Sequence, residues 1–227
     1  MMEDEAVFSV LSKCFAPVDE ADWKHLTGSA TWSEFLDGAR RLLQDDRPFG
    51  LTLSPLARTR KRCPLQEFLS AGEVDALFCP PSFEEKNLFS ARHFTGGLID
   101  SALPVESLYS TWSVIPDEQT PFPQAKGLYL SDVARYVAAL VESMGLSIPD
   151  RFSDCPDHLA LELDLVAVML RSDMQSQAGQ FLAERFDWLT AYRMRLLEIG
   201  DEARFYIGLI DVLLGIRAQQ SAAAMSA

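Results

Sequence analysis

The stretch 154–171, which reads DCPDHLALELDLVAVMLR, constrains the fold most, because its apolar residues surround almost a whole helix. Asp154 is a suitable N-cap, and Pro156 suits the first turn, where a missing N–H costs little. Beyond them, apolar residues at helical spacing form two stripes, one of Leu159, Leu163, Val166 and Leu170 and one of Leu161, Leu165 and Val168. A helix that is apolar on most faces is buried on most faces, so we predict a central core helix.

The same stretch carries polar residues near its start, namely Asp157, His158 and, one turn further on, Glu162. Buried polar groups need hydrogen-bond or charge partners, so we expect each of these side chains to have one. They either cap the helix and satisfy one another inside the core, or they form a wall of a binding site. Spacing alone favours the capping interpretation and leaves the second one open.

Helical spacing recurs along most of the chain, and no segment alternates strongly enough to predict a strand. Two capping boxes, Thr31 with Glu34 and Ser82 with Glu85, are typical of helix starts. We predict an all-α fold, a single globular domain of about nine or ten helices over residues 1–217, followed by a disordered tail at 218–227. Besides the core helix, the predicted helices are 5–15, 19–26, 31–43, 64–77, 82–94, 130–144, 175–199 with a break near Trp188, and 201–217.

The composition excludes some classes of protein. Hydrophobic residues make up 48% of the 227 residues, enough for a sizeable core, and the net charge is −13. That charge disfavours nucleic acid, whose phosphates need a basic surface, and suits a cationic partner. No apolar run reaches the roughly 18 residues of a membrane span, so we expect no stable membrane insertion. The first ten residues, MMEDEAVFSV, are acidic where a signal peptide is basic, so we expect a cytoplasmic protein.

A long Pro-containing segment, 98–124, precedes the predicted helix at 130–144. Loops of this length are uncommon in compact domains and are usually functional or disordered. Within it, residues 103–112 read LPVESLYSTW, in which apolar and aromatic residues flank Glu106 and Ser107. The segment therefore predicts a loop that is either simply anchored by its aromatics or closed over the start of the core helix.

Two motifs in this order resemble a known family. PVESLY, at Pro104–Tyr109, is similar to a loop motif of the chaperones for trimethylamine-N-oxide, dimethyl-sulfoxide and nitrate reductases, also called redox enzyme maturation proteins. PDHLALEL, at Pro156–Leu163, resembles the start of a helix in that family, and MGLSIPDRFSDC between them resembles its spacer. Val105 stands where the family usually has an aromatic residue. The resemblance extends from about residue 89 to residue 217.

The resemblance implies an all-α, TorD-like fold and a cytoplasmic chaperone without catalytic residues or a bound cofactor. Its partner would be the catalytic subunit of an apo-molybdoenzyme, held by its twin-arginine signal peptide or N-terminal segment until the molybdopterin cofactor is inserted. The chaperone itself would be a monomer or a homodimer. The implied peptide-binding residues are Phe94, Leu103, Pro104, Glu106, Ser107, Tyr109, Trp112, Asp157, His158 and Glu162. Among these, the carboxylates suit guanidinium groups and the apolar side chains suit the apolar run that follows the arginines.

Two other functions remain open at this point. Asp157, His158 and Glu162 could be metal ligands of a small all-α hydrolase, since residues four apart share a helix face. That spacing is common by chance, however. The chain could also be a helical interaction domain of a regulator, with a partner unrelated to molybdoenzymes.

Overall fold

The computed structural model describes residues 2–43, 80–96, 100–110 and 132–225, and the regular elements of these residues are helices. The exception is a single isolated bridge between Val105 and His158. The α-helices are α1 (Asp4–Phe15), α2 (Glu20–Leu26), α3 (Ser29–Leu43), α5 (Phe83–His93), α6 (Asp132–Ser143), α7 (Leu159–Arg171), α8 (Gln175–Arg185), α9 (Leu189–Ile199) and α10 (Arg204–Met225). Short 3₁₀ turns are η3 (Glu106–Leu108), η4 (Asp150–Phe152), η5 (Phe186–Trp188) and η6 (Asp201–Ala203). The all-α prediction is confirmed.

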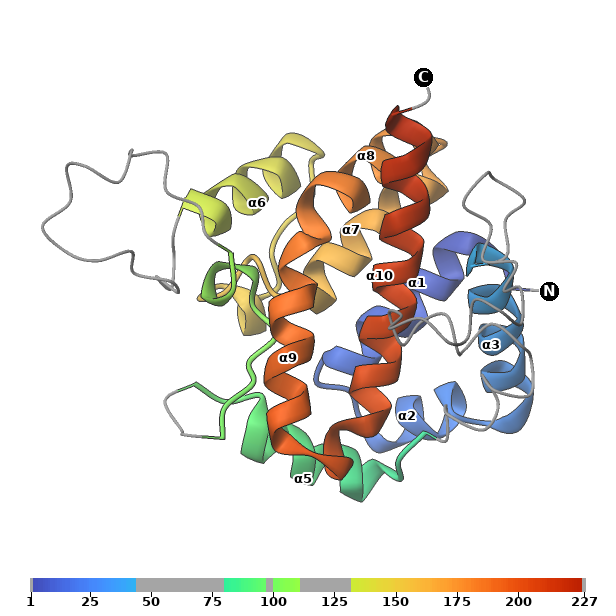
Figure 1. Cartoon of the computed structure of the whole chain (residues 1–227), viewed down its shortest axis with the longest axis vertical. Coiled ribbons are helices and arrows are strands. Elements are labelled where there is room, and N and C mark those ends of the chain that lie inside the picture. Colours follow the sequence, from blue (N-terminus) through green and yellow to red (C-terminus); the bar gives the residue numbers. More distant parts are fainter. Residues whose placement is uncertain (1, 44–79, 97–99, 111–131, 226–227) are drawn as a thin grey trace, which may run out of the picture.

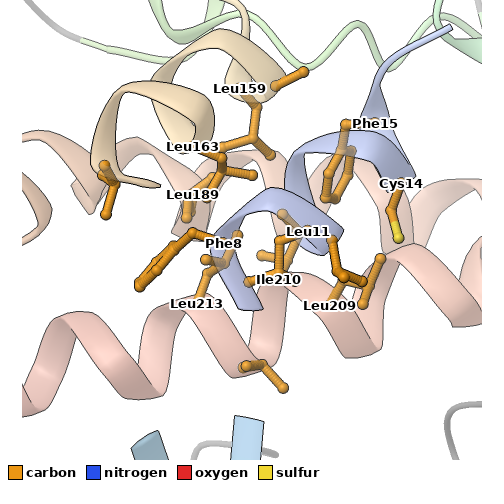
Figure 2. Close-up of a cluster of buried hydrophobic side chains, with 14 of the residues drawn as sticks. Phe8, Leu11, Cys14, Phe15, Leu159, Leu163, Leu189, Leu209, Ile210 and Leu213 are labelled. Atoms are coloured by element: carbon orange, nitrogen blue, oxygen red, sulfur yellow. The ribbon is translucent and has the colours of Figure 1, made fainter. Parts of the chain in front are cut away.

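Helix α7 lies in the middle of the molecule, as the apolar stripes predict. Figure 1 shows α7 next to α1 and α8, and α1 is the helix with which it makes the most extensive contact. Figure 2 shows the layer in which Phe8 and Leu11 of α1 meet Leu163 of α7 and Leu213 of α10. These side chains are at most 2% exposed, so the hydrophobic core is continuous across three segments far apart in the sequence.

The close approach of α1 to its neighbours depends on two small residues. Ser12 of α1 donates a hydrogen bond through Oγ to the buried carbonyl of Ala160 in α7, at 2.8 Å. On α3, a Cβ at Gly38 would lie 2.6 Å from Cγ2 of Val7, a distance that requires the neighbour to move. Small residues therefore let α1 lie against both α7 and α3.

The two predicted capping boxes have different outcomes. At the start of α5, Ser82 N donates to Glu85 Oε2 at 2.7 Å and Glu85 N donates to Ser82 Oγ at 3.2 Å, so this capping box is confirmed. The box at Thr31 is wrong, because α3 already begins at Ser29. The N–H of Trp32 donates to the carbonyl of Gly28 at 2.9 Å, which places Thr31 inside the first turn.

The start of α7 also differs from the prediction. Asp154 is not its N-cap, because residues 150–158 form the 3₁₀ turn η4 and further turns before the helix begins at Leu159. His158 is the N-cap instead, and its Nδ1 accepts the N–H of Ala160 at 3.1 Å. The turns present the backbone of residues 155–158 to the segment before η3, which a helix beginning at Asp154 could not do.

The last helix continues beyond residue 217, where we expected the domain to end. Helix α10 runs to Met225, and Gln219 is only 3% exposed because its Nε2 donates to the carbonyl of Leu43 at 2.5 Å. This hydrogen bond satisfies a carbonyl at the C-terminal end of α3 and holds the extra turn of α10. The predicted helix at 64–77 lies outside the described residues. None of the described helices combines the length and the apolar character needed to cross a bilayer.

Candidate functional site

The N-terminal end of α7 is joined to the segment 104–107, and we call this contact the junction. Glu106 N donates to the carbonyl of Asp157 at 3.0 Å, and Leu159 N donates to the carbonyl of Pro104 at 2.8 Å. Ser107 N donates to Oδ2 of Asp157 at 2.7 Å in a buried position. The first N–H of α7 and the first two N–H groups of η3 are thus satisfied by backbone and carboxylate partners some fifty residues away in the chain.

Glu106 points from the junction into the protein, where it is paired with Arg185, the last residue of α8. Arg185 Nη2 lies 2.5 Å from Glu106 Oε2, and the two side chains are 6% and 1% exposed. The guanidinium of Arg185 also lies over the ring of Tyr136 in α6, 5.0 Å from its centroid. Arg185 therefore lies between a carboxylate and an aromatic ring, the two groups that best accommodate a guanidinium.

A second carboxyl group, that of Glu162, is buried next to Glu106. Burial raises the pKa of Glu162 well above its ordinary value, and the neighbouring Glu106 raises it further. Burial also raises the pKa of Glu106, against the opposing effects of a hydrogen bond with Glu162 and of the charge of Arg185. These surroundings thus favour the neutral form of the Glu162 carboxyl, and the junction contains more carboxyl groups than cations.

His158 serves the helix rather than a ligand in this structure. It is 5% exposed, its Nδ1 accepts the N–H of Ala160, and its ring lies 4.9 Å from that of Phe152. Burial lowers the pKa of His158 to about 3, with a further contribution from the charge of Arg151. The histidine therefore stays neutral at physiological pH and keeps an acceptor nitrogen available for the cap.

Tyr109 extends the junction toward α9. Its ring is stacked on Trp188 with a centroid distance of 5.8 Å and meets Tyr192 edge-on at 5.2 Å. Tyr109 is half-buried, whereas Trp188 and Tyr192 are buried. The aromatic residue that follows η3 thereby anchors this segment on the C-terminal helices.

The structure brings most of the predicted site residues together at the junction, namely Pro104, Glu106, Ser107, Asp157, His158 and Glu162. Leu103 is half-buried on the same segment. Phe94 lies in another cluster, where its ring contacts Phe15, Phe89 and Tyr206. Trp112 lies outside the described residues. The three predicted carboxylates are at most 1% exposed, so they face the interior and not the solvent.

Residues 90–199 match the family model of the nitrate reductase delta subunit, which is just under half of the chain. Over these residues the chain is similar to the nitrate reductase delta subunit family. No curated protein and no solved structure gives a significant match. The resemblance to molybdoenzyme chaperones is thereby confirmed. Members of this family are chaperones of redox enzyme maturation and act with nitrate reductase-type enzyme subunits.

The segment matched to the delta subunit family contains the whole junction and also two residues that the sequence analysis missed. Arg185 and Tyr136 both lie within it and complete the surroundings of Glu106. A pattern could have identified Arg185, because it continues the buried stripe of α8 formed by Ala178, Phe181 and Leu182. A cation at a core position requires a buried anion, and Glu106 is that anion.

The side chains of the junction form hydrogen bonds and charge pairs. Among the residues that the structure describes, no three or more His, Cys, Asp and Glu side chains are arranged to hold a metal ion. Asp157 and His158 accept backbone N–H groups, and Glu162 faces Glu106. The arrangement therefore offers no support for a hydrolase that uses Asp157, His158 and Glu162 as metal ligands.

Proposed function

We propose that this protein is a cytoplasmic chaperone that binds the twin-arginine signal peptide or N-terminal segment of an apo-molybdoenzyme. Binding would prevent premature export and keep the enzyme competent for insertion of the molybdopterin cofactor. The observation that supports this most is the junction, in which PVESLY and PDHLALEL, both inside the family match, hydrogen-bond directly to each other. Two motifs that resemble the same family thus form one structural unit.

The charge of the protein and the chemistry of α6 fit such a peptide. A net charge of −13 attracts a cationic segment, and the junction concentrates carboxyl groups beside an aromatic ring. An adjoining face of α6 and the turn after it form a largely apolar groove of about 450 Å³. Its lining residues are Arg135, Ala138, Ala139, Val141, Glu142, Leu146 and Ile148. We propose that this groove holds the apolar run and that the junction, with Leu103 and Tyr109, receives the arginines.

The expected affinity follows from opposing contributions. Burial of three or four apolar side chains contributes roughly 1.5–3 kcal/mol each. Ordering a disordered peptide costs about 2–5 kcal/mol or more, in addition to the loss of translational and rotational freedom. A micromolar dissociation constant, near −8 kcal/mol, is the result we expect. Binding of that strength allows release once the client is complete.

The binding surface can be tested with a fluorescently labelled synthetic twin-arginine signal peptide and a version in which both arginines are lysines. Leu146 is 39% exposed in the groove and Leu88 of α5 is 70% exposed outside it, so they form a matched pair. We expect Leu146→Asp to weaken binding about tenfold, the loss of roughly one buried side chain. Leu88→Asp should leave it unchanged. Equal effects of the two variants would place the apolar run elsewhere.

The client can be identified by purifying the tagged chaperone from its native cell and analysing the bound proteins by mass spectrometry. We expect the catalytic subunit of a molybdoenzyme, enriched in its cofactor-free form. The same experiment with Leu146→Asp should lose that subunit and with Leu88→Asp should keep it. A specific partner without any molybdoenzyme character would overturn the proposal in favour of a helical interaction domain.

A further inference from the structure

The strongest unassigned feature is the enclosure around the Arg185 guanidinium. It consists of the Glu106 carboxylate at 2.5 Å and the Tyr136 ring at 5.0 Å, with the carboxyl of Glu162 next to Glu106. We call these three side chains the guanidinium box. A carboxylate for charge-assisted hydrogen bonds and a ring for stacking are the groups that bind arginine in preference to lysine. The protein thus already contains an arginine site, and one of its own arginines occupies it.

Arg185 engages this box from two sides. Its Nη2 donates to Oε2 of Glu106, and its guanidinium lies over the ring of Tyr136. The Glu162 carboxyl, which is 0% exposed, is hydrogen-bonded to Glu106. One oxygen of Asp157 lacks a hydrogen-bond partner among the described residues. Buried acceptors are rarely left unpaired, so the surroundings of the box can accept a further donor.

The box also has a route to the surface. Tyr136 is 47% exposed, so the aromatic wall reaches solvent on α6, the helix that carries the apolar groove. Arg185 is the final residue of α8 and precedes the 3₁₀ turn η5. A side chain at a helix end can change its rotamer without disturbing the helical hydrogen bonds that precede it. The guanidinium could therefore leave the box while α8 stays in place.

We propose that Arg185 is an internal competitor that holds the guanidinium box until an arginine of the client peptide replaces it. This inference rests on the proposed function and adds a specificity-determining residue to it. Replacement exchanges one guanidinium for another, so the buried carboxylate of Glu106 is never left without a cation. A lysine cannot replace Arg185 as well, because its ammonium lacks the planar fork that stacks on Tyr136 and bonds Glu106.

The proposal predicts that Arg185 lowers the affinity for the client. When the binding-competent state is only a fraction of the population, the apparent dissociation constant rises by the inverse of that fraction. If the box is open in about one molecule in ten, Arg185→Met should bind a twin-arginine peptide roughly tenfold more tightly than the wild type. Arg185→Lys should give a smaller increase. The version of the peptide with two lysines should gain little in either variant.

The first experiment measures the labelled peptide against the wild type, Arg185→Met, Arg185→Lys and Arg193→Met by fluorescence anisotropy. Arg193 is the matched control, because it also pairs with a buried carboxylate but lies outside the box. Circular dichroism verifies the fold of each variant. Tighter binding by Arg185→Met, with a smaller gain for Arg185→Lys and none for Arg193→Met, supports the inference. If the wild type binds and Arg185→Met binds equally or less tightly, the inference is overturned while the proposed function stands. If neither binds, the proposed function is overturned, and the inference with it.

A second experiment addresses the box without the client. In Arg185→Ala, added methylguanidinium should occupy the vacated space and raise the melting temperature, whereas methylammonium should have a smaller effect. The wild type and the double variant Glu106→Gln/Arg185→Ala should show no such stabilisation. This measurement retains its meaning even if Arg185→Met proves too unstable for peptide titration. If methylguanidinium changes the melting temperature of all three proteins equally, the box does not bind an external guanidinium and the inference is overturned.

Discussion

This protein contains two buried arginine–carboxylate pairs that differ in the groups around them. In the first, Arg193 of α9 binds Asp211 of α10 through two contacts, from Nε to Oδ1 at 2.5 Å and from Nη2 to Oδ2 at 3.2 Å. In the second, Nη2 of Arg185 in α8 donates to Oε2 of Glu106, beside a second carboxyl group. Asp211 is 0% exposed and Glu106 is 1% exposed, so burial does not distinguish them.

The difference lies in which other ionisable groups surround each pair. Burial raises the pKa of Asp211, and hydrogen bonding and charge from Arg193 alone oppose this. The pKa of Glu106 depends in addition on Glu162 and Asp157. A pair whose charges are matched by each other fixes the register of two neighbouring helices. A pair with two further acidic side chains beside it is a place where another donor can enter.

The largest effect is expected at the matched pair. Arg193→Met leaves Asp211 buried without its cation, and we expect the free energy of unfolding at neutral pH to fall by about 3–5 kcal/mol. Urea denaturation measures this loss. The double variant Arg193→Met/Asp211→Leu should recover most of it, because both charges are then absent. A loss below about 1 kcal/mol, as for a surface pair, would show that this pair does not hold α9 and α10 together.

A smaller loss in the free energy of unfolding is expected at the Arg185–Glu106 pair. Arg185→Met should cost about 2 kcal/mol at neutral pH, because Glu106 can take up a proton instead of remaining as a stranded charge. Arg185 lowers the pKa of Glu106, so its removal raises that pKa further. The variant then binds more protons when folded, and its deficit should shrink as the pH falls from neutral to mildly acidic. A deficit that does not change with pH would show that Glu106 keeps its charge.

Glu162 offers a third test, through pH dependence rather than overall stability. Its pKa is raised well above the ordinary value of 4.5, so its stabilising contribution is fully present below that value and is lost as the pH rises through the raised pKa. Glu162→Gln should flatten this part of the pH profile. It should cost less than about 1 kcal/mol, because the acid is already neutral. Urea denaturation of both proteins across the neutral range provides the comparison.

The smallest effect is expected at the helix cap beside the junction. His158→Ala removes the side-chain acceptor for Ala160 N and should cost about 1 kcal/mol, whereas His158→Asn should cost only a few tenths. Burial lowers the pKa of His158 from 6.5 to about 3, so the wild type loses this contribution as the pH falls below 6.5. The deficit of His158→Ala should therefore shrink at acidic pH. Thermal unfolding at two pH values measures the difference.

The fold was largely predictable because its signals are local. The apolar stripes of α7, the break near Trp188 and the capping box of Ser82 each depend on residues within a few turns of one another. The errors occurred where a distant contact decided between local alternatives. Asp154 is a better N-cap than His158 by residue type. However, the carbonyl of Pro104 accepts the N–H of Leu159 and the carboxylate of Asp157 accepts the N–H of Ser107, and these hydrogen bonds hold the turns that precede the helix.

Only part of the candidate site was predictable from the sequence, namely that its two motifs act together. The motifs around Glu106 and Asp157 indicated that these residues act together, and the structure places them within hydrogen-bonding distance. Their exposure was not predictable, since a carboxylate in a loop usually faces water. Arg185 reverses that expectation, because it comes from a different helix and permits Glu106 to be buried.

The sequence by itself thus determined the helical class, the central position of α7 and the two motifs of the family, because all three depend on residue type and short-range spacing. Only the tertiary structure decided which charges face one another. A pairing such as Arg185 with Glu106 depends on packing between segments far apart in the chain, and no local pattern records it. That packing makes the carboxylates an internal site rather than a surface one.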